Sequence, residues 1–242
     1  MSKLTVSNLT KVVKNKTLLN NVCLSLNYGQ VYSVIGDNGA GKTTLFRCIL
    51  GLSQPIGTVA LDDKVVNSFN YNEFLKKVGV VFPFPDSFGA YTVKEVFENH
   101  TRYYACQSVD VESYLKKFGL NVYLGDMICK FSLGMKQRLN IALACLHNPD
   151  ILILDEPFNG LDRDGILFLQ HLLLDFKKQE KLIIISSHSF AELEKITDRL
   201  IFIQQGEILV DTDVLEIKRQ GFETFEQFYR KIKEEYLSLI HI

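Results

Sequence analysis

A glycine-rich segment near the amino terminus carries the clearest chemical signal in the chain. It reads GDNGAGKTT and fits the spacing G-x-x-x-x-G-K-[ST]. Glycines let the backbone wrap so that successive N–H groups point inward at one anion, and a helix beginning near Gly41 would add its unpaired N–H donors. Lys42 would bring a full charge to the β- and γ-phosphates of a nucleotide, and the Thr43 hydroxyl can ligate Mg²⁺. The residues expected to bind the nucleotide here are Gly36, Asp37, Asn38, Gly39, Ala40, Gly41, Lys42, Thr43 and Thr44.

Two neighbouring carboxylates form a second candidate group. Asp155 and Glu156 follow the apolar run ILIL at residues 151–154. A buried strand that ends in Asp-Glu places both acids at the carboxyl edge of a sheet, where open α/β folds bind ligands. We expect Asp155 to hold Mg²⁺, usually through water, and Glu156 to orient and deprotonate an attacking water molecule. Taken singly, the glycine-rich segment could be a turn beside a solvated lysine, and the acids could cap the next helix; together they favour a nucleotide site.

The elements that must position these groups follow from the hydrophobic pattern. Short apolar runs that are reached through helices are typical of buried strands in a parallel α/β sheet. The predicted strands of this kind are residues 31–35, Val78–Phe82, Ile151–Leu154 and Leu182–Ile185. A helix over Thr44–Leu50 would follow the glycine-rich segment and end at Gly51.

Other segments predict antiparallel strands and helices around that sheet. Alternating apolar and polar residues predict a strand pair over residues 3–28, with its turn at Lys14–Lys16. Two further hairpins are predicted at Thr58–Val66 and at Leu200–Ile203 with Glu207–Val210. Helical spacing predicts a mainly helical stretch over Thr92–Leu146 and a last helix over Phe222–Leu239. We expect one apolar face of the last helix to pack on the body of the protein: Phe225, Phe228, Tyr229, Ile232, Tyr236 and Leu239.

The composition excludes several classes of protein. At 242 residues, with 47% apolar and 23% charged residues, the chain is long enough for one large domain with its own core. A net charge of −1 gives no electrostatic basis for nucleic-acid binding. No apolar run reaches the roughly 18–20 residues that span a bilayer, and the first ten residues lack the apolar region of a signal peptide, so any membrane link would come through a partner chain. Five scattered cysteines are expected to be reduced thiols of a cytosolic protein: Cys23, Cys48, Cys106, Cys129 and Cys145.

Three further motifs complete a pattern that resembles one protein family. FSLGMKQR at Phe131–Arg138 resembles a signature sequence, FNGLD at Phe158–Asp162 resembles a D-loop, and SSH at Ser186–His188 resembles a switch histidine. Together with the two groups above, their order and intervals resemble the ATP-binding cassette (ABC) ATPases over roughly residues 3–212. The resemblance implies an α/β fold, with a P-loop NTPase core and mixed sheet, an N-terminal antiparallel β subdomain and an inserted α-helical subdomain.

The resemblance also implies how the chain divides. Residues 1–242 would form a single ABC ATPase domain. The core with the antiparallel β subdomain would occupy residues 1–83 and 147–212. The helical subdomain with the signature would occupy 84–146, and a C-terminal helical extension 213–242.

In this family two cassettes close head to tail around two ATP molecules with Mg²⁺. On that model, Ser132 and the backbone N–H of Gly134 would contact the γ-phosphate bound by the other subunit. His188 would bridge the γ-phosphate and the opposing D-loop, and Asp162 would help to couple the two sites. The catalytic residues would be Lys42, Glu156 and His188. The implied partners are a second ABC ATPase subunit, identical or not, and an integral membrane permease chain that holds the protein at the cytoplasmic face of the cell membrane.

The chain departs from its family at two functional positions. An aromatic residue normally stacks on adenine, but Val12 and Val13 stand at the corresponding place. A glutamine that reaches Mg²⁺ and the attacking water is replaced by Pro83, which has no side-chain oxygen or amide; Asp86 is a candidate substitute. Leu133 and Met135 also stand where many relatives have Gly and Gln. Nucleotide binding is therefore expected to be weaker, and the metal's coordination to be completed by water or turnover to be slower.

Three functions remain open at this point. The first is the energising subunit of a membrane transporter, and the form SLGMKQR with NGLD and SSH resembles the group that exports antimicrobial peptides and drugs. The second is a soluble ABC ATPase acting on DNA or the ribosome, although such relatives carry coiled-coil arms or two cassettes in one chain. The third is a regulatory subunit that closes on ATP with little hydrolysis. Pro83 and Val13 favour this function, and the intact Lys42, Asp155, Glu156 and His188 oppose it.

Overall fold

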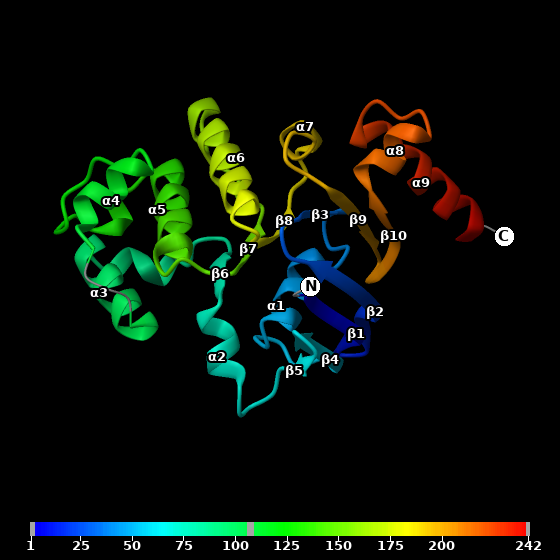
Figure 1. Ribbon diagram of the computed structural model, residues 1–242, viewed down its shortest axis with the longest axis horizontal. Helices are drawn as coiled ribbons and strands as arrows, with labels where there is room; N and C mark the ends of the chain where they lie inside the picture. Colours follow the sequence, from blue (N-terminus) through cyan, green and yellow to red (C-terminus); the bar gives the residue numbers. More distant parts are fainter. Residues whose placement is uncertain (1–2, 106–108, 241–242) are drawn as a thin grey trace.

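The computed structural model describes residues 3–105 and 109–240. Within those residues the centre is a six-stranded sheet with the strand order β10-β9-β3-β8-β7-β6 (Figure 1). Its strands run parallel except β10, which pairs antiparallel with β9 at one edge. The strands are β3 (Val31–Ile35), β6 (Val78–Val81), β7 (Ile151–Asp155), β8 (Leu182–Ser186), β9 (Arg199–Gln204) and β10 (Glu207–Asp213). The mixed sheet and its predicted strands are confirmed.

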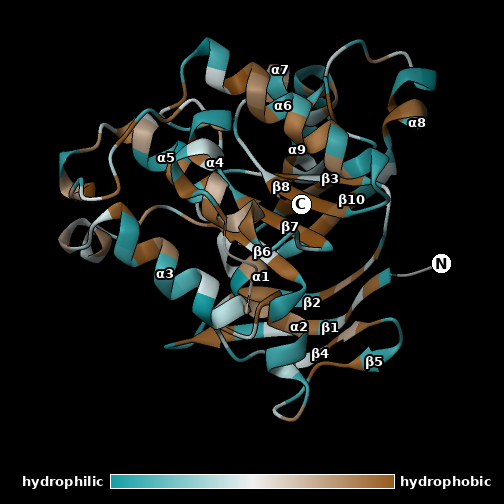
Figure 2. Cartoon of the chain, turned by 60° about the vertical axis from the view of Figure 1, so that its left-hand side comes forward, coloured by the Kyte–Doolittle hydropathy of each residue, from teal (hydrophilic) through white to brown (hydrophobic). Residues whose placement is uncertain are grey.

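Apolar side chains explain why the central strands form this sheet. Every residue of β3, β7 and β8 is buried, because other elements cover both faces of the sheet. One face packs against α5 (Leu133–Leu146) and α6 (Arg163–Lys178), and the other against α1 (Lys42–Ile49) and a second sheet (Figure 2). The carboxyl ends of three neighbouring strands, β3, β8 and β7, therefore lie together, and the loops that carry the candidate site begin there.

The second sheet is antiparallel and contains the N-terminal strands. In the described part of the chain its order is β2-β1-β4-β5. Its strands are β1 (Lys3–Val13), β2 (Lys16–Asn27), β4 (Ile56–Leu61) and β5 (Lys64–Val65). They confirm the strand pair predicted over residues 3–28 and the hairpin predicted at Thr58–Val66, and the antiparallel pair β9–β10 of the central sheet confirms the third. The pairing of β1 with β4 joins the hairpins into one sheet. That pairing was not predicted, because alternation within a strand does not say which distant strand it meets.

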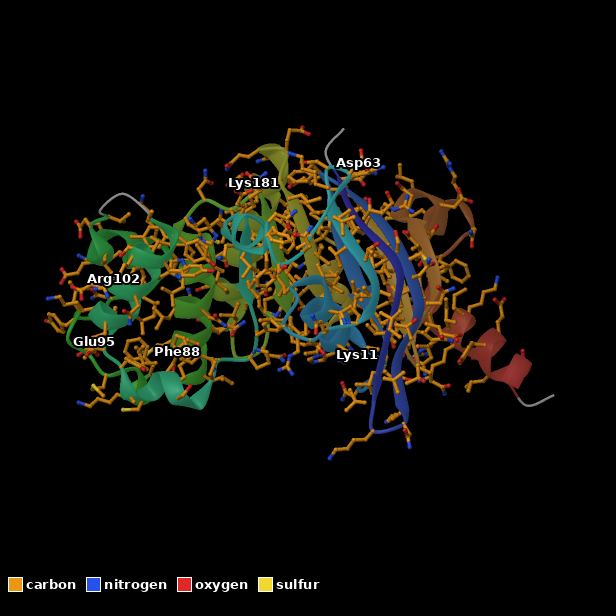
Figure 3. All side chains as sticks on the ribbon, turned by 90° about the horizontal axis from the view of Figure 1, so that it is seen from below. Lys11, Asp63, Phe88, Glu95, Arg102 and Lys181 are labelled. Atoms are coloured by element: carbon orange, nitrogen blue, oxygen red, sulfur yellow. The ribbon has the colours of Figure 1, made fainter. Side chains whose placement is uncertain are left out.

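The segment between β6 and β7 is mainly helical, as predicted. It contains α3 (Val93–Tyr104), α4 (Val111–Lys117), α5 and the short 3₁₀ turns η1 (Asp86–Ala90) and η2 (Ile128–Lys130). A capping box starts α3: the Thr92 hydroxyl accepts from the Glu95 N–H at 3.3 Å, and the Glu95 carboxylate accepts from the Thr92 N–H at 2.7 Å. These helices lie at one end of the molecule, where Glu95 and Arg102 mark α3 (Figure 3). The subdomain boundaries at residues 83/84 and 146/147 stay a prediction.

The C-terminal segment folds back onto the protein. It follows α7 (Phe190–Leu193) and β10 as α8 (Val214–Arg219) and α9 (Phe225–Ile240). Phe225 and Phe228 are buried, and Tyr229 and Ile232 pack against the same core, which confirms the predicted packing for these four residues. Tyr236 is half-buried, and its hydroxyl donates to the Gln205 side chain at 3.5 Å. The side chain of Leu239 lies outside the described part.

A short helix before β6, α2 (Tyr71–Lys76), was not predicted, because its six residues are too few to establish a helical period.

Two findings bear on the expectations from composition. No helix among the described residues is both long and apolar enough to cross a membrane. Cys23, Cys48, Cys129 and Cys145 are free thiols, and Cys106 lies outside the described residues. Burial raises the pKa of the Cys145 thiol to about 12, so that this side chain stays protonated near neutral pH. It is partly exposed and packs against the hydrophobic core.

Candidate functional site

The glycine-rich segment forms a loop between the end of β3 and the start of α1. The loop turns at Gly39 and Gly41, whose φ angles of 79° and 117° favour glycine. α1 begins directly after Gly41 without a side-chain cap, so its first N–H groups are available to an anion. The Lys42 side chain is buried beneath the loop, and its Nζ donates to the carbonyl oxygens of Gly36 at 2.6 Å and Asp37 at 3.2 Å. Backbone carbonyl oxygens of the loop thus hold the ammonium group of Lys42 in place.

Asp155, the last residue of β7, is buried and held from two sides. Its Oδ2 accepts a hydrogen bond from the Thr43 hydroxyl at 2.6 Å, and its Oδ1 accepts one from the Ser186 hydroxyl at 2.5 Å. The second contact follows from strand register, because Asp155 lies opposite Ser186 in the parallel pair β7–β8. Ser186 belongs to the SSH motif, but the motif alone did not predict its hydrogen bond to Asp155.

The Thr43–Asp155 pair supplies the kind of atoms that Mg²⁺ prefers. Both are hard oxygen donors, and they lie 2.6 Å apart beside the loop. Across the described residues, no cluster of three or more His, Cys, Asp or Glu side chains could hold a metal. Mg²⁺ at this place would therefore combine the two protein oxygens with phosphate oxygens and water, the coordination typical of nucleotide enzymes. The residues present fit the ion on those terms.

Glu156 and His188 form a second polar pair at the same edge of the sheet. The His188 Nδ1 lies 2.8 Å from the Glu156 Oε2, and the His188 backbone N–H donates to that oxygen at 3.2 Å. The Glu156 backbone has φ of 51°, a left-handed conformation that is uncommon outside glycine and often found at functional sites. Its N–H donates to the carbonyl oxygen and to the hydroxyl of Ser186, each at 3.1 Å, which holds the backbone in that conformation.

A hollow of about 300 Å³ lies beside the glycine-rich loop and the two carboxylates. His188 is not among its lining residues and is joined to it through Glu156. The loop residues 37–44 line it together with Asp155 and Glu156, so the predicted phosphate and acid groups do lie together. Lys16 and Leu18 of β2 also line it, and sequence reasoning did not find them. The Lys/Asn-rich turn was a signal for Lys16, but only the fold brings that turn beside the loop.

The signature and D-loop residues lie outside this hollow and form a separate surface group. Ser132 is exposed and caps α5, its Oγ accepting from the Met135 N–H at 3.2 Å. Gly134 packs so closely on the D-loop that an added Cβ would lie 2.7 Å from the Gly160 carbonyl oxygen. Because Ser132 is exposed, the N-terminus of α5 is accessible to a neighbouring molecule.

Asp162 is held within its own subunit. It caps α6 by accepting from the Gly165 N–H at 3.0 Å, and it pairs with Arg138 at 2.6 Å. The Arg138 hydrogen bond holds the pKa of Asp162 below its usual range, so the carboxylate stays ionised. Arg138 also donates to the Phe118 carbonyl oxygen at 3.1 Å. The signature helix and the D-loop are therefore fastened to each other.

The two departures from the family pattern are also visible in the structure. Val12 and Val13 are 50% and 43% exposed, so they offer apolar contact but no aromatic face. Pro83 lies in the loop after β6, and the neighbouring Phe82 carbonyl oxygen accepts from the Asn140 side-chain amide of α5 at 2.6 Å. Asp86 belongs to η1, and its side chain is outside the described part. Its suggested role as a substitute therefore stays a prediction.

Comparisons with known proteins cover almost the whole chain. The family model described as "ABC transporter" matches residues 19–159. The lantibiotic transport ATP-binding protein SrtF of Streptococcus pyogenes is 34% identical over 93% of this chain and 95% of its own length. The bacitracin transport ATP-binding protein BcrA of Bacillus licheniformis is 33% identical over 89% of this chain and 71% of its own length. A solved structure of the ATP-binding subunit of an ABC transporter matches with a TM-score of 0.86 and 25% identity, over 96% of this chain and 99% of that one.

Proposed function

This chain belongs to the ABC transporter family, and we propose that it hydrolyses ATP to energise export of a peptide or drug-like molecule through a separate membrane-spanning chain. The observation that carries the proposal is the likeness, over nearly the whole chain, to relatives named as ATP-binding proteins of lantibiotic and bacitracin transport. The arrangement of Lys42, Asp155 and Glu156 around one hollow supports hydrolysis rather than binding alone.

Hydrolysis of ATP requires the protein mainly to position the reactants and to stabilise charge, with little covalent chemistry of its own. Lys42 and the N–H groups of the loop would bind the β- and γ-phosphates, and Thr43 and Asp155 would hold Mg²⁺. When bound, Mg²⁺ neutralises charge on the phosphate oxygens. Glu156 would take a proton from a water molecule as its oxygen attacks the γ-phosphorus, and the bond to the bridging oxygen would break with its electron pair leaving on ADP. His188, hydrogen-bonded to the Glu156 Oε2 at 2.8 Å, would fix the direction of that carboxylate.

A second cassette, identical to this chain or related to it, would complete each site. Ser132 and Gly134 stand at the exposed N-terminus of α5, where helix N–H groups favour an anion, and would meet the γ-phosphate of the other subunit. Asp162 would transmit the state of one site to the other, since Arg138 joins the D-loop to the signature helix. These roles predict that the isolated chain binds ATP but hydrolyses it only when paired.

We infer that the membrane chain docks beside the helical segment at residues 84–146. A hollow of about 410 Å³ lies between β6, η1, α3 and α5, lined mostly by apolar and aromatic side chains such as Phe88 and Tyr91. The stiff loop at Pro83 and Pro85 leads into it, so movement at the nucleotide site and at this hollow would be linked. Docking there would hold the chain at the cytoplasmic face of the membrane.

Purification from membranes and reconstitution would test the proposal. The protein, co-purified with its membrane chain and placed in lipid vesicles, should release phosphate from ATP and move a peptide substrate only when ATP and Mg²⁺ are present. Lys42→Ala provides the inactive comparison. Phosphate release no faster than that of Lys42→Ala, from wild-type protein that is folded and bound to its partner, would overturn the proposal.

A further inference from the structure

The C-terminal helix α9 reaches the phosphate-binding loop at one carboxylate. The Tyr229 hydroxyl donates to the Asp37 Oδ1 at 2.5 Å, and the Lys233 Nζ donates to both oxygens of Asp37 at 2.9 and 2.8 Å. The Gln204 amide of β9 adds a bond to Oδ2 at 3.2 Å. A residue of the loop is therefore held by two side chains that come almost two hundred positions later in the chain.

Asp37 brings a negatively charged side chain to the loop that is expected to bind phosphates. It follows Gly36 directly, and its own carbonyl oxygen accepts from the Lys42 Nζ at 3.2 Å. An uncompensated carboxylate here would repel a nucleoside triphosphate and would offset part of the positive charge of Lys42. Hydrogen bonds from Lys233 and then Tyr229 hold the pKa of Asp37 below its usual range, so it is an ionised group that needs compensation. Lys233 brings the matching positive charge.

Packing fixes α9 in the orientation that makes these bonds. The Tyr229 ring lies against Phe202 of β9 and Phe190 of α7, with ring centroids 4.8 and 5.3 Å apart. Phe190 comes two residues after His188, the group that binds Glu156. Burial, and then its bond to Asp37, raise the pKa of Tyr229 above its usual range, so its hydroxyl remains a donor. Tyr229 thus joins the phosphate loop to the segment that follows the switch histidine.

We propose that Tyr229 and Lys233 are positioning residues of the nucleotide site, which act through Asp37 to neutralise its charge and to fix the phosphate-binding loop. The C-terminal helix then sets the affinity for ATP without touching the nucleotide. The inference rests on the proposed function, because it takes the loop to be a triphosphate site. It extends that function to a part of the chain beyond the residues that carry the family motifs.

The alternative is that these bonds only fasten α9 to the protein. The side chains of Lys233 and Asp37 are 35% and 39% exposed, and ion pairs of that kind contribute little to stability. The two roles therefore differ in what the loss of these bonds would change. Loss of a fastening contact lowers the free energy of unfolding, and loss of a positioning contact lowers nucleotide affinity. The second effect also disappears when the charge of Asp37 is removed.

The test is the affinity for adenylyl imidodiphosphate with Mg²⁺, measured by calorimetry, together with KM and kcat for ATP of the assembled transporter. Lys233→Met should weaken binding and raise KM about three- to tenfold, with kcat within about twofold of wild type, because an unpaired carboxylate then faces the phosphates. Tyr229→Phe, which keeps the ring, should produce a smaller change in the same direction. Lys231→Met is the matched control on the same helix, since Lys231 pairs with Glu235 at 3.7 Å, and it should bind as wild type does.

Removal of the charge of Asp37 separates the two roles. Against an Asp37→Asn background, Lys233→Met should change affinity by less than about twofold, because there is no longer a carboxylate to neutralise. Equal affinity of wild type and Lys233→Met, or an equal loss in Lys231→Met, would overturn the inference, and so would an undiminished loss in the Asp37→Asn background. Absence of binding by the wild-type protein would instead overturn the proposed function.

Discussion

Replacement of Glu156 by glutamine is the perturbation that separates binding from hydrolysis. Glutamine has nearly the same size, and its amide oxygen can still accept from the His188 N–H, which donates to the Glu156 Oε2 at 3.2 Å. The backbone bonds from Glu156 N–H to Ser186 are unaffected by the change of side chain. The fold and the hollow should therefore persist. The amide cannot take a proton from water, so the change removes only the proposed general base.

The size of the loss follows from that role. General-base help is worth about 10²- to 10⁴-fold, or about 2.7–5.4 kcal/mol in the activation barrier. Phosphate release by Glu156→Gln at saturating ATP should fall by that factor, while the affinity for ATP stays within about threefold of wild type. The variant should also accumulate a closed dimer that retains its nucleotide. Glu234→Gln on the exposed side of α9 is the matched control and should turn over normally. Turnover of Glu156→Gln within about threefold of wild type would refute the reasoning.

Three further predictions concern the expected adenine contact, the buried Asp155, and a partly buried histidine pair, His100 and His147, whose ring nitrogens lie 3.3 Å apart. Val13→Tyr should tighten ATP binding by several-fold to a hundredfold, since base–aromatic stacking contributes roughly 1–3 kcal/mol; unchanged affinity in a binding titration would refute it. Ser186→Ala removes a hydrogen bond to the buried Asp155, so urea unfolding should show a loss of about 1–3 kcal/mol and phosphate release should fall. Burial lowers the pKa of both His100 and His147 to about 4. Below about pH 6.5 the unfolded chain therefore binds protons at these histidines that the folded chain does not. As the pH falls from about 6.5 to 4, the free energy of unfolding should decrease by on the order of 1–3 kcal/mol. Replacing His100 and His147 with glutamine should flatten that part of the stability curve, and an unchanged slope would contradict this assignment.

Local pattern was sufficient where the chemistry is local in sequence. The glycine-rich loop and α1 follow each other directly in the chain, and the motif spacing alone predicted the turns at the glycines and the helix that begins after them. The burial of Lys42 was not predicted. The positions of Asp155 and Glu156 were predicted because acids that end a buried apolar strand must lie at the carboxyl edge of a parallel sheet. The register of β7 and β8 then decides which hydroxyl faces Asp155, and register does not follow from the residues of a single strand.

Contacts between distant segments were the part that sequence reasoning missed. The apolar face of α9 was predicted from helical spacing, but its polar side chains carry no period that would point to Asp37. The same holds for Lys16, which reaches the hollow because β2 crosses beside the loop. The pairing of Arg138 with Asp162 likewise depends on how α5 and α6 pack, which neither motif records.

A substitution at Ser132 tests most directly whether the signature acts on the nucleotide of another subunit. Asp and Asn both cap helices as well as serine does, so Ser132→Asp and Ser132→Asn should keep α5 intact and differ by one negative charge. The measurement is phosphate release by the assembled transporter, beside the affinity of the isolated chain for ATP. We predict wild-type affinity in both variants, turnover close to wild type in Ser132→Asn, and a loss of at least about 10²-fold in Ser132→Asp, because its carboxylate would face the γ-phosphate. Equal turnover of the two variants would contradict the account.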